Sequence, residues 1–261
     1  MARIRTRTIG RSLILTLADA PRQNALSADM VAEIEQALDA APQDLAALVV
    51  EGVAGVFCAG ADLKALSVAL SEAPGATDPV EALNAAGGRF FARFAALPFV
   101  TIALVDGAAV GGGMGLAAAA DIVIATPRAR FALTETSLGL PPAQIAPYLV
   151  ARLGERVARR LALTGARLDG REAAAVGLAD MFCENDGRDQ LETLLKSIER
   201  CAPGANAETK RLFRACRAEP PEVYIATAAR SFAAAVRGPE GKEGLAAFSE
   251  KRKPIWARSA P

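Results

Sequence analysis

The sequence predicts an α/β protein in which mainly parallel strands alternate with helices and a helical region ends the chain. Three observations lead to this prediction. Short β-type runs alternate with segments of helical periodicity, and from about residue 141 nearly all segments are helical. Four glycines also fall within the five positions 111–115, directly between a strand-type and a helix-type segment. We therefore expect an α/β core over residues 1–199 and a C-terminal helical region over residues 200–261.

The predicted strands are short runs of β-branched and other apolar residues with polar or small residues at their ends. Two of them flank Gly10 within residues 4–17. The others, in order, are 46–50, 101–105, 121–126 and 131–133.

The predicted helices follow from apolar residues spaced three or four apart. Ser27 is a good N-cap for the first helix, which runs to about residue 41 with Met30, Ile34 and Leu38 on one face. Residues 67–84 carry small residues, two prolines and a glycine, and we interpret them as a loop, either mobile or an ordinary surface connection. The other predicted helices are 80–96, 143–153, 155–163, 170–176, 189–201 and three more towards the end.

Composition excludes several classes of function. With 52% apolar residues the chain can bury a large core, and 30 basic against 29 acidic residues give no charge that would attract nucleic acid or an anionic membrane. Four cysteines without metal-site spacing indicate reduced thiols and no metal, and no apolar run reaches membrane-spanning length, so we expect a cytoplasmic protein. The chain has no histidine, so Glu, Asp, Lys, Tyr or Cys must perform any acid–base step.

Two glycine-containing turns suit a negatively polarised oxygen. Glycines between a strand and a helix leave backbone N–H groups free and let a ligand approach them, which occurs at 107–115 and again at 57–63. One donor from each loop could form an oxyanion hole. Gly113, Gly115 and Ala118 also satisfy a dinucleotide fingerprint, but the next strand follows too soon for a complete βαβ unit. Close helix packing alone is the structural alternative.

The order and spacing of several motifs resemble the crotonase (enoyl-CoA hydratase/isomerase) superfamily. The resemblance covers about residues 3–254 and implies a spiral of ββα units, with C-terminal helices that join chains into a homotrimer or into a hexamer that is a dimer of trimers. The motifs that carry it are Pro21-Arg-Gln-Asn-Ala-Leu26, the segments 55–63 and 107–115, Phe131-Ala-Leu-Thr-Glu135 and Leu138-Gly-Leu-Pro-Pro142.

The resemblance also implies roles for individual residues. The backbone N–H groups of Ala61 and Gly112 would bind the thioester oxygen of an acyl-CoA, and Glu135 would move the proton. Coenzyme A would be part of the substrate, and no other cofactor is expected. Asp62 is also a candidate helix N-cap, Lys251 a candidate solvated charge and Glu135 a candidate solvated helix-start residue. The residues matching contacts to the CoA arm are Ala25, Ala59, Asp62 and Leu63, with Phe248 and Lys251 reaching the adenine nucleotide, often of a neighbouring subunit.

The chain departs from the family at two positions that border the acyl group. Gly115 stands where hydratases carry a second glutamate. Gln144 lies in a segment where many members have glycines, so it would add an amide donor to the acyl pocket. One glutamate suffices for Δ3,Δ2-enoyl-CoA isomerases. A hydratase with one glutamate could use water for the remaining proton transfer. The third possibility is a non-catalytic relative that binds acyl-CoA. Gly115 would otherwise widen the pocket for a bulky acyl group. Residues 138–147 resemble isohexenylglutaconyl-CoA hydratases, which act on branched acyl-CoAs.

Overall fold

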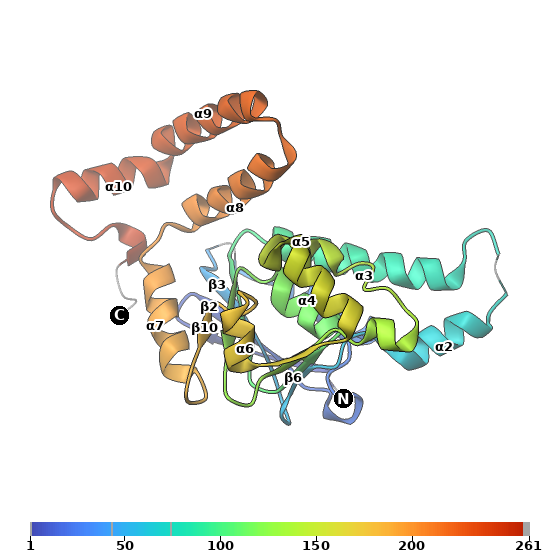
Figure 1. Ribbon diagram of the computed structural model, residues 1–261. Coiled ribbons are helices and arrows are strands. Elements are labelled where there is room, and N and C mark those ends of the chain that lie inside the picture. Colours follow the sequence, from blue (N-terminus) through green and yellow to red (C-terminus); the bar gives the residue numbers. More distant parts are fainter. Residues whose placement is uncertain (1, 43, 74, 258–261) are drawn as a thin grey trace.

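The computed structural model describes residues 2–42, 44–73 and 75–257, and its elements form two sheets with surrounding helices (Figure 1). The larger sheet has the strand order β1-β2-β3-β5-β7-β10. Among the described residues of this sheet, β1 and β2 pair antiparallel and all the other neighbouring strands pair parallel. The prediction of mainly parallel strands is confirmed. The strands are β1 (Ile4–Ile9), β2 (Ser12–Leu17), β3 (Ala47–Gly52), β5 (Val100–Val105), β7 (Ile122–Ala125) and β10 (Met181–Phe182).

The smaller sheet consists of short strands that the sequence pattern mostly does not reveal. Its order is β4-β6-β8-β9, and each of the first three follows directly after a strand of the larger sheet. A strand in each sheet followed by helical structure gives the repeated ββα unit of a spiral. These strands are β4 (Val56–Cys58), β6 (Ala108–Val110), β8 (Arg130–Ala132) and β9 (Arg167–Asp169).

The larger sheet is buried on both faces. Along β2, Leu13, Leu15 and Leu17 belong to the main hydrophobic core, whereas Ile14 belongs to a second cluster on the opposite face. Residues of a strand alternate between faces, so this division follows from the pleat. Helix α7 (Arg188–Glu199) covers the second face with its buried leucines and isoleucine.

The helices of the core agree with the predicted segments except at two places. Residues 67–84 were predicted to be a loop, but they contain the end of one helix and the start of the next. Asp78 caps the second of these helices, and Pro79 takes its first position, where the missing N–H of proline costs nothing. The predicted helices 143–153 and 155–163 both lie within α5 (Ala146–Thr164), the first of them starting later than predicted, and the predicted break between them is confirmed by the non-helical backbone of Gly154 (φ 70°, ψ 155°). The helices are α1 (Ala28–Asp39), α2 (Leu63–Ser71), α3 (Pro79–Ala96), α4 (Gly112–Ala119), α5 (Ala146–Thr164) and α6 (Gly170–Ala175).

Three C-terminal helices form an arm that extends away from the sheets (Figure 1). They are α8 (Pro203–Ala218), α9 (Pro221–Arg237) and α10 (Pro239–Ser249), and each has proline in its first turn. Large apolar side chains are exposed along them, including Phe213, Ile225, Phe232 and Leu245. Within the described residues, no helix of the chain is long and apolar enough to cross a membrane.

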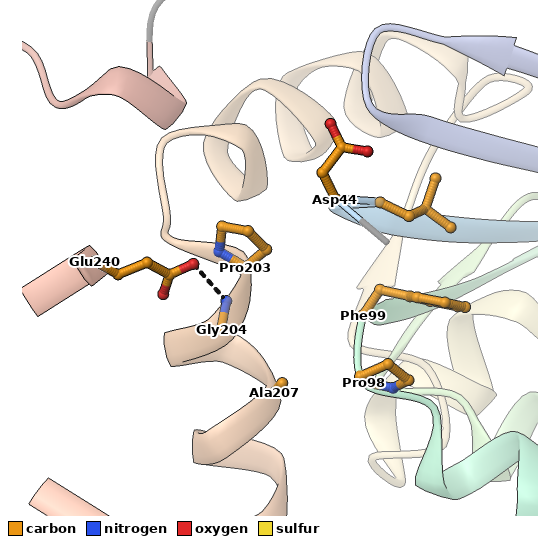
Figure 2. A pocket seen from close by; sticks show the side chains of 8 residues that line it. Asp44, Pro98, Phe99, Pro203, Gly204, Ala207 and Glu240 are labelled. Carbon is orange, nitrogen blue, oxygen red and sulfur yellow. Dashed lines mark hydrogen bonds between the residues drawn. The ribbon is translucent and has the colours of Figure 1, made fainter. Parts of the chain in front are cut away.

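The arm is attached to the core by a small number of polar contacts. The Lys210 ammonium lies 2.6 Å from a carboxylate oxygen of Asp121 and donates to the Phe99 carbonyl. A pocket of about 390 Å³ lies between the start of α8 and the residues that precede β5. Figure 2 shows the side chains that line it. Across it from Pro98 and Phe99, the Glu240 carboxylate accepts from the backbone N–H of Gly204 at the start of α8. Lys210 thus joins α8 to the core, whereas the Glu240–Gly204 bond joins α10 to α8 within the arm.

Candidate active site

Two loops meet at the two glycine-containing turns. A Cβ atom added to Gly60 would lie 2.8 Å from the amide nitrogen of Gly112, and one added to Gly112 would lie 3.4 Å from that of Ala61. The backbone N–H of Leu26 donates to the Gly60 carbonyl, which ties the first loop to the segment before α1. The structure therefore places the two predicted donors, Ala61 and Gly112, side by side.

The amide of Gly112 is free of helical pairing because of its position. Helix α4 begins at Gly112, and the first bond across its N-terminal turn runs from the Gly115 N–H to the Gly111 carbonyl, at 2.9 Å. The earlier N–H groups of a helix have no partner within it and lie at its partially positive end. Gly60 (φ 90°) and Gly111 (φ 53°) adopt backbone conformations that favour glycine. This geometry suits an anionic or polarised oxygen.

The Glu135 carboxyl group lies next to these donors. It belongs to the 3-10 turn η2 (Glu135–Leu138), and its Oε1 is 3.0 Å from the position of a Cβ atom on Gly111. Its Oε2 is buried and has no hydrogen-bond partner among the described residues. Burial raises the pKa of Glu135, and hydrogen bonds from the backbone N–H groups of Glu135 and Thr134 partly offset this rise. A half-buried carboxyl group with a raised pKa, one of whose oxygens has no hydrogen-bond partner among the described residues, is suited to proton transfer.

The space beside Gly115 is filled. A Cβ atom on Gly115 would lie 2.7 Å from the Cβ of Ile145 and would overlap its Cγ2. Ile145 is 4% exposed and precedes α5. The absence of a side chain at Gly115 therefore does not widen a pocket, because an isoleucine from another element occupies the place.

Gln144 is directed to α3. Its Nε2 donates to Asn84 Oδ1 at 2.7 Å, and its Cδ lies 2.7 Å from the position of a Cβ atom on Gly88. The amide donor predicted for the acyl pocket is thus engaged with another amide in this structure, and it connects the segment before α5 to α3.

The residues predicted to contact the CoA arm line the first loop. The Ala59 N–H donates to the Gln23 carbonyl, and Ala25 is buried next to Leu26. Asp62 caps α2, where it accepts from the N–H groups of Lys64 and Ala65, so its predicted capping role is confirmed. Leu63 follows it and is 55% exposed.

Phe248 and Lys251 lie elsewhere in the fold. Phe248 is on α10 and is 85% exposed, and Lys251 follows the end of that helix. Figure 1 places α10 and α2 at opposite ends of the molecule. Within one chain these two residues are therefore not brought to the oxyanion site.

Two positioning residues escaped the sequence analysis. The buried Asn24, at φ 55°, donates its side-chain amide to the Val56 carbonyl at 2.7 Å and holds the 21–26 segment against β4. The buried Cys58 accepts from the Gly60 N–H at its Sγ, 3.4 Å away. Asparagine's tolerance of left-handed backbone was the available signal for the first; nothing in the sequence pattern indicated the second.

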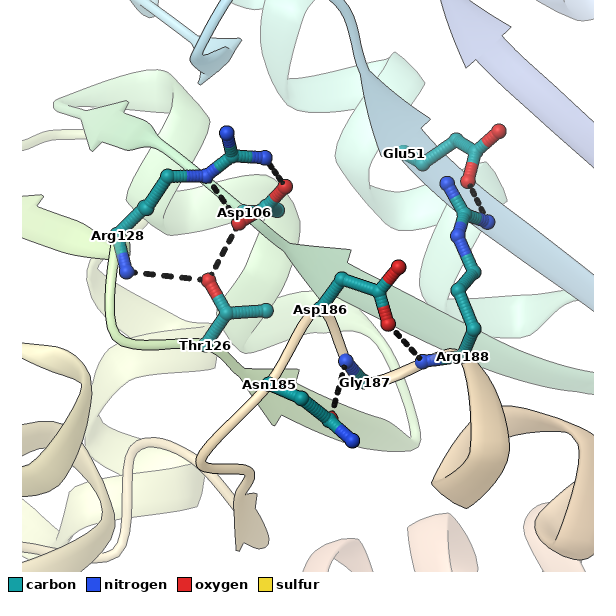
Figure 3. Close-up of polar contacts among 8 residues, drawn as sticks. All are labelled: Glu51, Asp106, Thr126, Arg128, Asn185, Asp186, Gly187 and Arg188. Atoms are coloured by element: carbon teal, nitrogen blue, oxygen red, sulfur yellow. Dashed lines mark hydrogen bonds and ion pairs between the residues drawn. The ribbon is translucent and has the colours of Figure 1, made fainter.

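A second polar cluster lies where β3, β5 and β7 end (Figure 3). Arg128 forms an ion pair with Asp106, which also accepts from the Thr126 hydroxyl, and Arg188 pairs with Glu51. The Arg128 guanidinium lowers the pKa of Asp106, so that carboxyl stays ionised and is no general acid near neutral pH. The cluster joins α7 to the strand ends and does not compete with Glu135 as a catalytic site.

Comparison with known proteins agrees with this geometry. The sequence matches the enoyl-CoA hydratase/isomerase family over residues 9–259. A 2,3-dehydroadipyl-CoA hydratase of Escherichia coli is 29% identical, with 94% of each chain covered. An enoyl-CoA hydratase/isomerase from Marinobacter aquaeolei has a TM-score of 0.93 at 40% identity, covering 98% of this chain and 99% of its own. Pseudomonas aeruginosa AtuE has a TM-score of 0.93 at 43% identity, covering 98% and 100%.

The fold thus defines a crotonase-fold protein, in which the backbone N–H groups of Ala61 and Gly112 lie close to one carboxyl group, that of Glu135. The chain belongs to the enoyl-CoA hydratase/isomerase family of the crotonase superfamily, and it is an enzyme of the hydratase or isomerase class.

Proposed function

We propose that this enzyme hydrates or isomerises an unsaturated acyl-CoA through a thioester enolate. The observation that carries the proposal is the position of the half-buried Glu135 carboxyl, whose Oε2 has no partner among the described residues, beside the adjacent N–H groups of Ala61 and Gly112. Those N–H groups would donate to the thioester oxygen, where negative charge develops in the enolate. Loss of one such donor typically lowers turnover by about 10²–10³-fold.

Glu135 can serve both reactions as a single proton carrier. In hydration, the carboxylate takes a proton from water while the water oxygen bonds to Cβ and the Cα=Cβ electron pair moves to the thioester oxygen. The protonated Glu135 then returns the proton to Cα. In isomerisation, the carboxylate removes a proton from Cα or Cγ and returns it to the other carbon. Neither route needs a second carboxylate, a metal or a redox cofactor.

For the substrate we propose a branched acyl group. The support is the resemblance of residues 138–147 to hydratases of branched acyl-CoAs. Because Ile145 fills the space beside Gly115, the branch would lie beyond the acyl carbons next to the thioester.

We also propose that the arm joins chains into homotrimers or pairs of trimers. The exposed apolar residues on α8–α10 are the kind of surface that a partner chain covers. In such an assembly Phe248 and Lys251 would contact the adenine nucleotide bound to a neighbouring chain.

Incubation of the enzyme with a 2-enoyl-CoA and with a 3-enoyl-CoA, followed by mass spectrometry, tests the reaction class. Hydration adds the mass of one water molecule, whereas isomerisation leaves the mass unchanged and alters the chromatographic retention. If neither thioester is converted although both bind, the chain is an acyl-CoA-binding relative and the proposal is wrong.

A further inference from the structure

Glu135 and Ile145 lie against two glycines at the N-terminal end of α4. Gly111 is the N-cap of α4 and its carbonyl accepts from the Gly115 N–H, so the two glycines are one helical turn apart. Oε1 of Glu135 lies 3.0 Å from the Cβ position of Gly111, and the Cβ of Ile145 lies 2.7 Å from that of Gly115. The Ile145 side chain therefore fills the position one turn further into α4 than the Glu135 carboxyl.

Ile145 is held firmly in this place. Its carbonyl accepts from the N–H groups of Tyr148 and Leu149 in the first turn of α5, and the preceding Gln144 is bonded to Asn84. It is 4% exposed within the main hydrophobic core. A side chain fixed from both sides has no free space into which it could withdraw when a ligand arrives.

We infer that Ile145 is a specificity-determining residue that limits substitution at the acyl carbons next to the thioester. The inference rests on the proposed function, in which an acyl carbon that exchanges a proton with Glu135 must lie next to Gly111 at the start of α4. Its substituents then extend towards the next turn, which Ile145 fills. Gly115 has a matching role, because a glycine at that position is what allows an isoleucine at 145.

The inference is tested by the preference between two substrates of equal length, a straight 2-enoyl-CoA and its 3-methyl-branched counterpart. The measured quantity is the ratio of kcat/KM for the branched over the straight thioester. A single methylene in an apolar pocket changes such preferences by about 10–200-fold, so we expect Ile145→Ala to raise the ratio at least about tenfold. Ile145→Val, which removes one methyl group, should raise it less.

Leu149→Ala is the matched control, because Leu149 is similarly buried one turn further along α5, whereas the three atoms nearest to the Cβ position of Gly115 all belong to Ile145. It should leave the ratio unchanged. If Ile145→Ala does not fold, the ratio of kcat/KM values measured for the milder Ile145→Val variant tests the inference. An unchanged ratio in an active position-145 variant, or an equal rise in Leu149→Ala, overturns this inference and leaves the proposed function intact. A wild-type enzyme that converts neither thioester overturns both.

Discussion

Substitution of Gly60 by alanine perturbs the proposed oxyanion site without touching an ionisable group. The new Cβ atom would lie 2.6 Å from the Val110 carbonyl oxygen and 2.8 Å from the Gly112 nitrogen. Both distances are shorter than any ordinary contact of a Cβ atom, and both neighbours are backbone atoms that cannot rotate away. The loop carrying Ala61 must therefore separate from the one carrying Gly112.

The expected magnitudes follow from two costs. A side chain at the positive φ of Gly60 costs about 1–3 kcal/mol of folding stability. Relief of the contacts with Val110 and Gly112 adds overpacking strain of about 1–3 kcal/mol. Because one oxyanion donor is displaced, we expect kcat to fall by about 10²–10³-fold.

Gly55→Ala is the matched control for this substitution. Gly55 also has a positive φ, of 70°, but a Cβ atom there would meet nothing within 4 Å. It should lose stability by the backbone cost alone and keep its turnover. Denaturant unfolding and steady-state kinetics on an enoyl-CoA measure both quantities. Wild-type turnover in Gly60→Ala, or an equal loss of turnover in Gly55→Ala, would refute the role of the Gly60–Gly112 contact.

Three further predictions concern stability and assembly. Because the pKa of Glu135 is raised in the folded protein, ionisation of this carboxyl weakens the fold as the pH rises above the ordinary pKa of 4.5. Glu135→Gln should therefore raise Tm more at pH 8 than at pH 4. An equal change in Tm at the two pH values contradicts this. Asp62→Ala should cost about 1 kcal/mol by removing the cap of α2, whereas Asp62→Asn should cost little; equal losses in urea unfolding would argue against the cap. Light scattering should show trimers or hexamers, and a stable monomer at micromolar concentration contradicts the proposed role of the arm.

Local signals in the sequence were sufficient for elements with a capped, one-sided apolar pattern. Ser27 caps α1, whose buried residues Met30, Ile34 and Leu38 are those of the predicted apolar face. Helix α2 was missed because none of its residues is buried, so it has no apolar stripe facing the core. The strands of the smaller sheet span only three residues each, which is too short for a period of two to show.

The candidate site divides in the same way. The turns at Ala61 and Gly112 could be predicted because glycines between a strand and a helix have local meaning. The role of Glu135 came from the resemblance, since a single glutamate in an apolar segment has no distinctive pattern. The contact between Gly115 and Ile145 could not be predicted, because it depends on how α5 packs against α4 rather than on either segment alone.

Proton exchange at the acyl carbons tests the central claim most directly. The enzyme is incubated in D₂O with an enoyl-CoA, and deuterium in the recovered thioester is measured by mass spectrometry, with binding of the same thioester followed by calorimetry. The wild-type protein should incorporate deuterium at a carbon next to the thioester or at Cγ. Glu135→Gln should bind the thioester equally well and incorporate it about 10²–10⁴-fold more slowly. Exchange at the wild-type rate in Glu135→Gln would show that another group moves the proton.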